Sequence, residues 1–154
     1  MKKIAYLTRN PNQTRKLGEI LAKEILKTAV LKKALVLGLE GDLGGGKTTF
    51  LQGLARGLGI KEKILSPTFV IMRRFQIKPT SSSFYHMDCY RLQNEKEALR
   101  LGLKKIFFSS RSILAVEWAE RIKKILPGNT IFIKFYFIDK NKRKITIKFP
   151  RNGK

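Results

Sequence analysis

Apolar positions in the first sixty residues follow two patterns. A period of three to four residues predicts an amphipathic helix whose apolar stripe consists of Leu17, Ile20, Leu21 and Ile25. A continuous apolar run at residues 34–40 instead predicts a buried strand, and a second helix is expected to begin at Lys47 and to end near Gly57 or Gly59. With a short strand at residues 3–8, this half of the chain alternates strands and helices.

The first of these helices carries a start signal. Asn10 can cap it, Pro11 suits its first position, and Gln13 can reach back toward the cap. The helix is therefore expected to begin directly after the first strand.

Extended patterns dominate beyond Pro67. Residues 68–77 and 84–92 predict two strands of an antiparallel hairpin, joined by a loop at residues 79–83. A short helix is expected at residues 95–101. This change of pattern indicates that the sheet continues after the second helix.

The last third of the chain is also rich in strands. A buried strand is predicted at residues 113–116, and residues 130–138 and 144–149 predict a final hairpin. Because helices and strands alternate early and strands prevail late, we expect an α/β fold with a mixed central β-sheet flanked by helices and a C-terminal β-hairpin. No linker or repeat divides residues 1–154, so a single domain is predicted.

Length and composition exclude several classes of protein. The 154 residues, 43% of them hydrophobic, can bury one core without disulfides or a structural metal. With Cys89 and His86 as the one cysteine and the one histidine, disulfide frameworks and Cys-rich or His-rich metal sites are excluded. No apolar run approaches the roughly 20 residues of a membrane span, and no leader peptide is recognisable. A cytoplasmic protein with no membrane partner is predicted.

The charge of the chain is strongly positive. It carries 33 Lys and Arg against 11 Asp and Glu, which gives a net charge of +22. Such an excess favours a polyanionic partner or an anionic surface, or it reflects a lysine-rich proteome.

A glycine-rich motif follows the predicted strand at residues 34–40. Residues 41–48 read GDLGGGKT and match G-x-x-x-x-G-K-[ST] in full. Glycines let backbone N–H groups surround phosphates at a helix N-terminus, the Lys47 ammonium can reach the β- and γ-phosphates, and the Thr48 hydroxyl can ligate Mg²⁺. The motif predicts a P-loop; the alternative is an ordinary glycine-rich turn.

A P-loop ATPase needs a second acidic group for the metal. Residues 113–117 form an apolar strand that ends on Glu117, as a Walker B element does with Glu in place of Asp. In a parallel sheet this carboxylate would emerge at the edge that holds the P-loop. Since many strands end in an acid by chance, the prediction depends on the P-loop.

Four motifs in a fixed order make the chain resemble a known family. They are GDLGGGKTTF at residues 41–50, SPTF at residues 66–69, FYHMDCYRL at residues 84–92 and VEW at residues 116–118. Residues 14–18, TRKLG, are similar to a fifth. On these motifs the chain resembles, over nearly its whole length, the bacterial TsaE (YjeE) family, P-loop ATPases with a P-loop NTPase-like domain that act in forming threonylcarbamoyladenosine in tRNA.

The resemblance implies a role for each matched residue. It implies that Thr48 and Glu117 hold Mg²⁺, that ATP hydrolysis requires Asp88, and that Thr14 and Thr68 lie at the nucleotide. Lys47, Glu117 and Asp88 are then the expected catalytic residues. The residues implied to cradle the phosphates are Gly44, Gly45, Gly46, Lys47, Thr48 and Thr49.

Several of these residues have plainer interpretations. Asp88 could be a strand-end acid that pairs with Arg91, Thr14 could be an exposed helix residue, and Thr68 could belong to an ordinary turn after Ser-Pro.

Other residues near the motifs stay open in the same way. Trp118 could lie at the site mouth or fill the core, and Tyr90 could contact partners or support the Asp88 strand. His86 is interpreted as a structural hydrogen-bonding residue. Cys89 stands where the family has Leu and is expected to act as a small buried hydrophobe, and Ala119 stands where the family commonly has Pro.

The resemblance also implies a function. It implies an Mg²⁺-dependent ATPase, slow alone, that acts with TsaD and TsaB in modifying the adenosine next to the anticodon of tRNA. One alternative is a small P-loop kinase, which would need an acceptor pocket and usually a late lid helix where this chain predicts a hairpin. The other is a basic nucleic-acid-binding module that uses residues 140–144 with Lys134, Lys148 and residues 151–154. Whether tRNA is contacted directly or only through the complex stays open.

Overall fold

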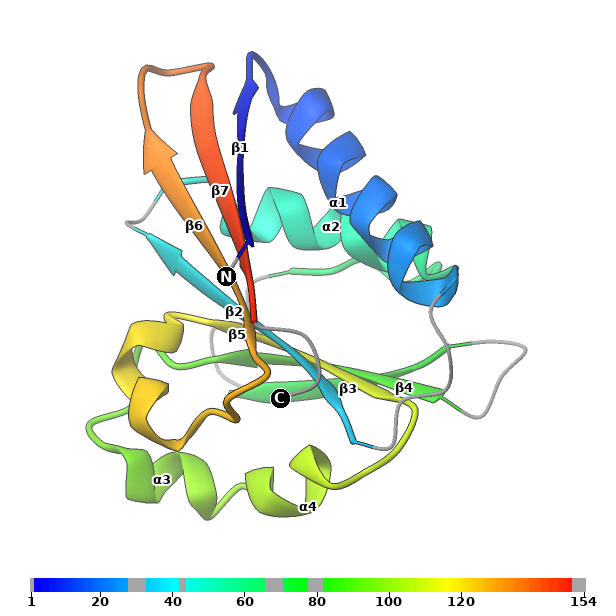
Figure 1. Cartoon of the computed structure of the whole chain (residues 1–154), viewed down its shortest axis with the longest axis vertical. Coiled ribbons are helices and arrows are strands. Elements are labelled where there is room, and N and C mark those ends of the chain that lie inside the picture. Colours follow the sequence, from blue (N-terminus) through cyan, green and yellow to red (C-terminus); the bar gives the residue numbers. More distant parts are fainter. Residues whose placement is uncertain (1, 28–32, 42–43, 66–70, 78–81, 151–154) are drawn as a thin grey trace.

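One seven-stranded mixed sheet organises the chain (Figure 1). The computed structural model describes residues 2–27, 33–41, 44–65, 71–77 and 82–150. In chain order the elements are β1 (Lys2–Thr8), α1 (Pro11–Lys27), β2 (Leu35–Gly41), α2 (Lys47–Gly57), β3 (Met72–Ile77), β4 (Ser82–Asp88), α3 (Glu95–Leu99), α4 (Leu103–Phe107), β5 (Ser112–Glu117), the 3₁₀ helix η1 (Ala119–Ile125), β6 (Ile131–Phe137) and β7 (Arg143–Phe149).

The strands lie in the order β1-β7-β6-β2-β5-β4-β3. Neighbouring strands from β6 through β2 and β5 to β4 are parallel. At one edge β7 and β1 add antiparallel strands, and at the other edge β3 pairs antiparallel with β4. The parallel strands β2, β5 and β4 therefore have their carboxyl ends at the same end of the sheet. Ligands bind at this end in open α/β sheets.

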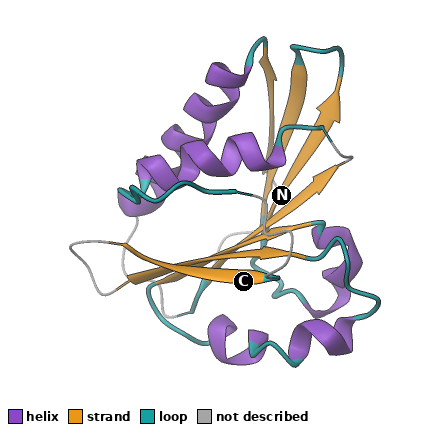
Figure 2. Ribbon diagram, turned by 180° about the vertical axis from the view of Figure 1, so that it is seen from behind, coloured by secondary structure: helices purple, strands orange, loops and turns teal. Residues whose placement is uncertain are grey.

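Each face of the sheet packs against its own helices (Figure 2). α1 and α2 cover one face and contribute Leu17, Leu21, Phe50 and Leu54 to the larger core cluster. α3, α4 and η1 cover part of the opposite face, around β2, β5 and β4. This two-sided burial explains why β5 is buried along its whole length.

Glycine allows α1 and α2 to approach backbone to backbone. A Cβ on Gly53 would lie 1.8 Å from the Arg15 carbonyl oxygen, and one on Gly18 would lie 2.2 Å from the Phe50 carbonyl oxygen. Only a residue without a side chain fits at such separations. The contact holds the first turns of α1 beside the start of α2.

Most of the elements predicted from the pattern are confirmed. The predicted cap is present, because Gln13 N–H donates to Asn10 Oδ1 at 2.9 Å and the Gln13 side chain accepts from Arg9 N–H at 2.8 Å. Both predicted hairpins form, although residues 66–70 and 78–81 lie outside the described part of the chain. The described helices include none long and apolar enough to cross a membrane.

Several details differ from the prediction. β4 begins at Ser82, inside the predicted loop, and ends at Asp88 rather than at residue 92, because the turn closed by Asp88 and Tyr90 follows it. α3 ends at Leu99 rather than at residue 101.

Ile20 is 49% exposed, whereas Leu17, Leu21 and Ile25 are 9% exposed, so the apolar stripe of α1 is narrower than expected. α4 and η1 have no counterpart in the prediction. Both are short, five and seven residues long, so neither shows a helical period in the sequence. η1 starts two residues after Glu117 and places Trp118 in the left-handed region with φ 58°.

Candidate nucleotide-binding site

The glycine-rich loop joins the end of β2 to the start of α2, as the motif predicts. Gly41, Gly44 and Gly46 have φ of 131°, 78° and 100°, the left-handed region that favours glycine. A Cβ on Gly41 would also lie 2.5 Å from the Phe135 carbonyl oxygen. Asp42 and Leu43 lie outside the described residues. The described part of the loop thus has the backbone that the motif requires.

Lys47 is turned back into the loop. Its side chain is 5% exposed, and its ammonium group donates to the Gly41 carbonyl oxygen. The same Nζ lies 4.2 Å from the centre of the Trp118 ring, a cation–π contact. A buried positive charge therefore lies beside the backbone of the glycine-rich loop.

Thr48 and Glu117 meet, although they are far apart in the sequence. Thr48 Oγ1 donates to Glu117 Oε1 at 3.3 Å. Thr48 lies in the first turn of α2, and Glu117, 3% exposed, is the last residue of β5. The structure thus brings together both residues that were expected to hold the metal.

His86 holds the other oxygen of this carboxylate. Its Nε2–H donates to Glu117 Oε2 at 2.6 Å, and both side chains are buried. His86 Nδ1 has no partner among the described residues. The prediction of a hydrogen-bonding histidine is confirmed, but its contact with the candidate metal ligand was missed. The sequence held only part of the signal: His86 lies two residues before Asp88, so both face the same side of β4, but the pairing of β4 with β5, which carries Glu117, has no local signal.

Asp88 lies beside Glu117 at the same sheet edge. The two residues are register partners at the ends of the parallel strands β4 and β5. Asp88 Oδ1 accepts the Tyr90 backbone N–H at 2.9 Å, so one carboxylate oxygen orders the turn that follows β4. Two acidic side chains therefore lie next to each other at the end of the sheet that carries the glycine-rich loop.

Thr14 contacts the loop from α1. It is 2% exposed, and its Oγ1 forms a hydrogen bond of 2.8 Å with Thr8 Oγ1 at the end of β1. Its Cγ2 lies 3.6 Å from the position that a Cβ on Gly46 would occupy. The interpretation of Thr14 as an exposed helix residue is therefore wrong, because α1 packs against the glycine-rich loop.

Arg143 contacts the loop from the C-terminal hairpin, and the sequence analysis missed it. Its Nε donates to the Gly44 carbonyl oxygen at 2.9 Å, and its Nη1 donates to the Asp139 and Lys142 carbonyl oxygens at 2.6 and 2.9 Å. The sequence pattern places Arg143 only in the basic run at residues 140–144. No local motif marks it, because its loop contact lies 99 positions away.

An aromatic pair extends from Lys47 toward the surface. Trp118 is half-buried and lies 5.0 Å from the Tyr90 ring, which is 43% exposed. The Arg121 guanidinium lies 5.8 Å from the Trp118 ring and 5.6 Å from the Tyr90 ring. Trp118 therefore lies at the loop, one of the two places considered for it, while it also packs against the second core cluster.

The remaining predicted residues are placed as follows. Gly45 is buried in the loop before α2, and Thr49 is half-buried in the first turn of α2. Thr68 lies outside the described residues. Cys89 is fully buried, as expected of a small hydrophobe, and burial raises the pKa of its thiol to about 12.

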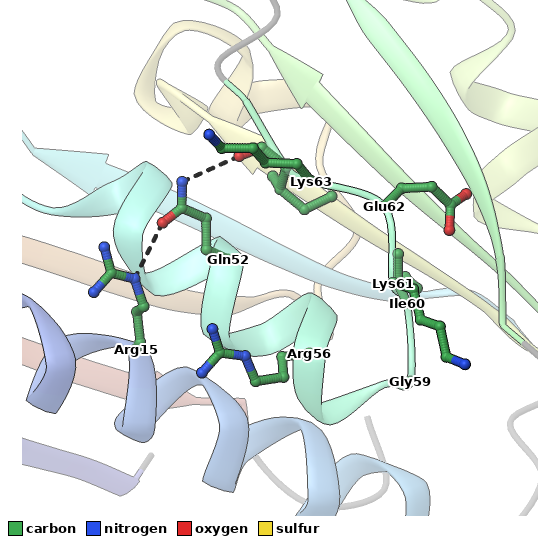
Figure 3. Close-up of a pocket in the computed structure, with 9 residues that line it drawn as sticks. Arg15, Gln52, Arg56, Gly59, Ile60, Lys61, Glu62 and Lys63 are labelled. Atoms are coloured by element: carbon green, nitrogen blue, oxygen red, sulfur yellow. Dashed lines mark hydrogen bonds between the residues drawn. The ribbon is translucent and has the colours of Figure 1, made fainter.

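A basic groove of about 830 Å³ lies between α1, α2 and residues 59–64 (Figure 3). Arg15 Nε donates to Gln52 Oε1 at 3.2 Å, and Gln52 Nε2 donates to the Ile64 carbonyl oxygen at 3.1 Å. Arg15 is the neighbour of Thr14, and Ile64 lies two residues before Ser66. Gln52 thus links α1, which contacts the glycine-rich loop, to residues 59–64, which precede the SPTF motif in the sequence.

Comparison with known proteins supports one family. The family model described as threonylcarbamoyl adenosine biosynthesis protein TsaE matches residues 8–145. A relative from Bacillus subtilis named tRNA threonylcarbamoyladenosine biosynthesis protein TsaE is 38% identical over 95% of this chain and 85% of its own length. One of the same name from Treponema pallidum is 32% identical over 92% and 97%. The crystal structure of Bacillus subtilis YdiB has a TM-score of 0.77 at 34% identity and covers 98% of this chain and 88% of that one.

Proposed function

The chain belongs to the TsaE family, and from that premise we propose that it is an Mg²⁺-dependent ATPase subunit of tRNA threonylcarbamoyladenosine biosynthesis that works with TsaD and TsaB. Its relatives carry the name of that biosynthesis. The ATPase chemistry and the two partners are the finer part of the proposal. They rest on the site geometry and on the resemblance of the motifs.

The contact between Thr48 and Glu117 is the observation that carries the ATPase proposal. A hydroxyl and a carboxylate 3.3 Å apart, at the start of the helix after a P-loop, are the hard oxygen donors that Mg²⁺ prefers. Within the described residues there is no cluster of three or more His, Cys, Asp or Glu that could hold a metal ion. A nucleotide-bound Mg²⁺ needs only one or two protein oxygens, since phosphates and water supply the others. The donor set therefore fits this ion, which would neutralise phosphate charge.

The other side chains of the site have separate tasks. Lys47 supplies positive charge inside the loop and, on nucleotide binding, exchanges the Gly41 carbonyl for phosphate oxygens. Asp88 accepts a hydrogen bond from the attacking water and orients it. His86 fixes the direction of the Glu117 carboxylate. Phosphoryl transfer requires positioning and charge neutralisation more than covalent chemistry by the protein. These four side chains provide the positioning and the positive charge.

The slow turnover expected of the isolated chain follows from the same geometry. Lys47 is engaged with Gly41 and Trp118, and one Asp88 oxygen is engaged with Tyr90. Nucleotide binding exchanges the Lys47 contact for phosphate, and Asp88 then has to turn toward the attacking water before hydrolysis. We propose that binding of TsaD and TsaB supplies this rearrangement.

Reconstitution tests the proposal. The chain is added to its cognate TsaB–TsaD pair with tRNA, a carbamoyl donor and ATP, and modified adenosine is quantified by mass spectrometry of digested tRNA. An ATP-dependent gain is expected, and it should be absent with the Lys47→Ala variant. No gain with the wild-type chain would contradict the proposal. Label from γ-labelled ATP that appeared in a small-molecule acceptor instead of free phosphate would favour a kinase.

A further inference from the structure

At the β1–β7–β6 end, one face of the sheet is covered by no helix among the described residues. α1 and α2 cover one side of these strands, whereas the helices of the opposite side lie at the other end of the sheet, around β2, β5 and β4 (Figures 1 and 2). Ile133, Phe135, Ile145 and Ile147 point toward α1 and α2. Because side chains alternate along a strand, the residues between them point to the uncovered side.

The nine residues that point to this side form a grid of three cross-strand rows, here called the open face; most are exposed, whereas Thr146 at its centre is 5% exposed and Phe132 is half-buried. The register aligns Tyr136 with Lys144 and Leu7, Lys134 with Thr146 and Ala5, and Phe132 with Lys148 and Lys3. Directly opposed side chains on one face lie about 5 Å apart at Cβ. Four lysines are thereby gathered among these nine positions, which include no acidic residue; on the neighbouring strand β2, Glu40 aligns with Lys134.

Aromatic and apolar groups lie among these cations. Tyr136 is 37% exposed and Leu7 is 50% exposed. Lys134 Nζ lies 5.3 Å and Lys144 Nζ 5.5 Å from the centre of the Tyr136 ring. At the border with η1, Lys123 Nζ lies 4.9 Å from the Phe132 ring and 3.9 Å from Glu40 Oε2. An exposed ring is therefore flanked by ammonium groups on a rigid sheet.

We propose that the open face binds single-stranded RNA. Lysines spaced along neighbouring strands complement successive phosphates, and an exposed aromatic ring on a sheet offers a stacking surface for an unpaired base. Duplexes and acidic proteins provide the charge but no free base face. This contact adds a direct RNA partner to the proposed function and rests on that proposal only for the choice of RNA as the nucleic acid.

The open face is separate from the candidate nucleotide site. Arg143, which contacts Gly44, aligns with Phe137 and Thr8 and so points to the α1 side, whereas Lys144 points to the open face. RNA binding is therefore expected without nucleotide, and its failure would leave the ATPase proposal untouched.

Binding is measured by fluorescence anisotropy with a labelled unstructured RNA of about 12 nucleotides, within the usual span of single-strand sites. The charge variant is K134Q/K144Q/K148Q, and its matched control is K104Q/K105Q/K124Q, which removes the same charge from exposed positions of α4 and η1. The open-face variant should bind about tenfold or more weakly, and its log–log salt slope should fall by about 2, because each single-strand phosphate contact contributes about 0.7. The control should change the slope by less than about 0.7.

A second variant tests stacking. Tyr136→Leu retains apolar surface but removes the ring, and it should weaken single-strand binding by about tenfold while it leaves binding of an RNA duplex of equal charge nearly unchanged. Thermal unfolding and nucleotide binding by both variants should match the wild type. The proposal is overturned if both triple variants lose equal affinity, if duplex binds as tightly as single strand, or if no RNA binds. It is also overturned if sedimentation shows a wild-type dimer that the open-face variant no longer forms.

Discussion

At the scale of single residues, the candidate site depends on a few polar contacts made across the sheet edge. Glu117 accepts a hydrogen bond from Thr48 on one carboxylate oxygen and from His86 on the other. Glu117 ends an apolar strand and Thr48 follows a glycine-rich loop, so each could be identified from the sequence. The distance between them could not, because it depends on β2 and β5 being neighbours.

Lys47 and Asp88 should separate nucleotide binding from turnover. Lys47→Ala should abolish binding of a fluorescent ATP analogue, because it removes the buried cation of the loop. Asp88→Ala should leave binding within about threefold and should lower phosphate release by about 10²-fold or more, the usual range for a group that acts on the proton or water of the reaction. Normal hydrolysis by the Asp88→Ala protein would show that this residue is not the water-orienting group.

His86 should act through Glu117. His86→Leu removes the donor to Glu117 Oε2, so the Mg²⁺ concentration at half-maximal hydrolysis should rise about 10- to 100-fold, as for other residues that orient metal ligands. His86→Gln keeps an N–H donor and should recover part of the loss. The measurement is an Mg²⁺ titration of phosphate release, with melting temperature recorded for each protein. An unchanged titration for His86→Leu would restrict this histidine to a purely structural role.

At the scale of elements, the position of α1 decides the shape of the site. The N-terminal segment could be predicted to be a helix from its period and cap, but not to lie on α2. The resemblance implied that Thr14 lies at the nucleotide, whereas the helical period did not bring it against the glycine-rich loop. Contact of this kind is set by Gly18 and Gly53, whose missing side chains allow two backbones to meet. Gly53 has no local sequence signal that distinguishes it from any other helical glycine, and Gly18 is marked only as the last residue of the TRKLG motif.

Gly53→Ala tests this contact. In an exposed helix the change would stabilise the protein by about 1 kcal/mol, but here the added Cβ would meet a backbone oxygen 1.8 Å away. We expect a loss of about 2–4 kcal/mol in the free energy of unfolding, measured by urea denaturation, because α1 must move away. Gly128→Ala is the matched control, since a Cβ there meets nothing within 4 Å, and it should stay within about 0.5 kcal/mol of wild type. Equal stability of the two variants would contradict the close approach.

At the scale of the whole molecule, the charge of +22 is distributed unevenly over functional surfaces. The candidate nucleotide site combines cations with Glu117 and Asp88, whereas the open face gathers lysines without acids. The composition left a polyanionic partner, an anionic surface and a lysine-rich proteome open, and it could not say where a partner would bind. The strand register, which brings residues 3, 134, 144 and 148 onto one face, supplies that location.

Cys89 reports on opening of the whole fold. Burial raises the pKa of its thiol to about 12 from an ordinary value of 9.0, so the folded protein keeps a proton that the unfolded chain releases above pH 9. Its contribution to stability is therefore complete below about pH 9 and is lost as the pH rises toward 12. At pH 8 the thiol should react with a disulfide reagent only at the rate of unfolding, and urea midpoints should fall between pH 9 and 11. Rapid labelling of the native protein would contradict this burial.

The sequence by itself determined the local features: the period of α1, the apolar run of β2, the glycine-rich turn with Lys47 and Thr48, and the carboxylate at the end of β5. Each depends on neighbours in the chain, through backbone preferences and the alternation of side chains. Only the tertiary structure decided that His86 meets Glu117, that Arg143 reaches Gly44, and that four lysines share one face. These contacts join residues that are distant in the sequence, and strand order and register, set by burial of the two cores, determine them.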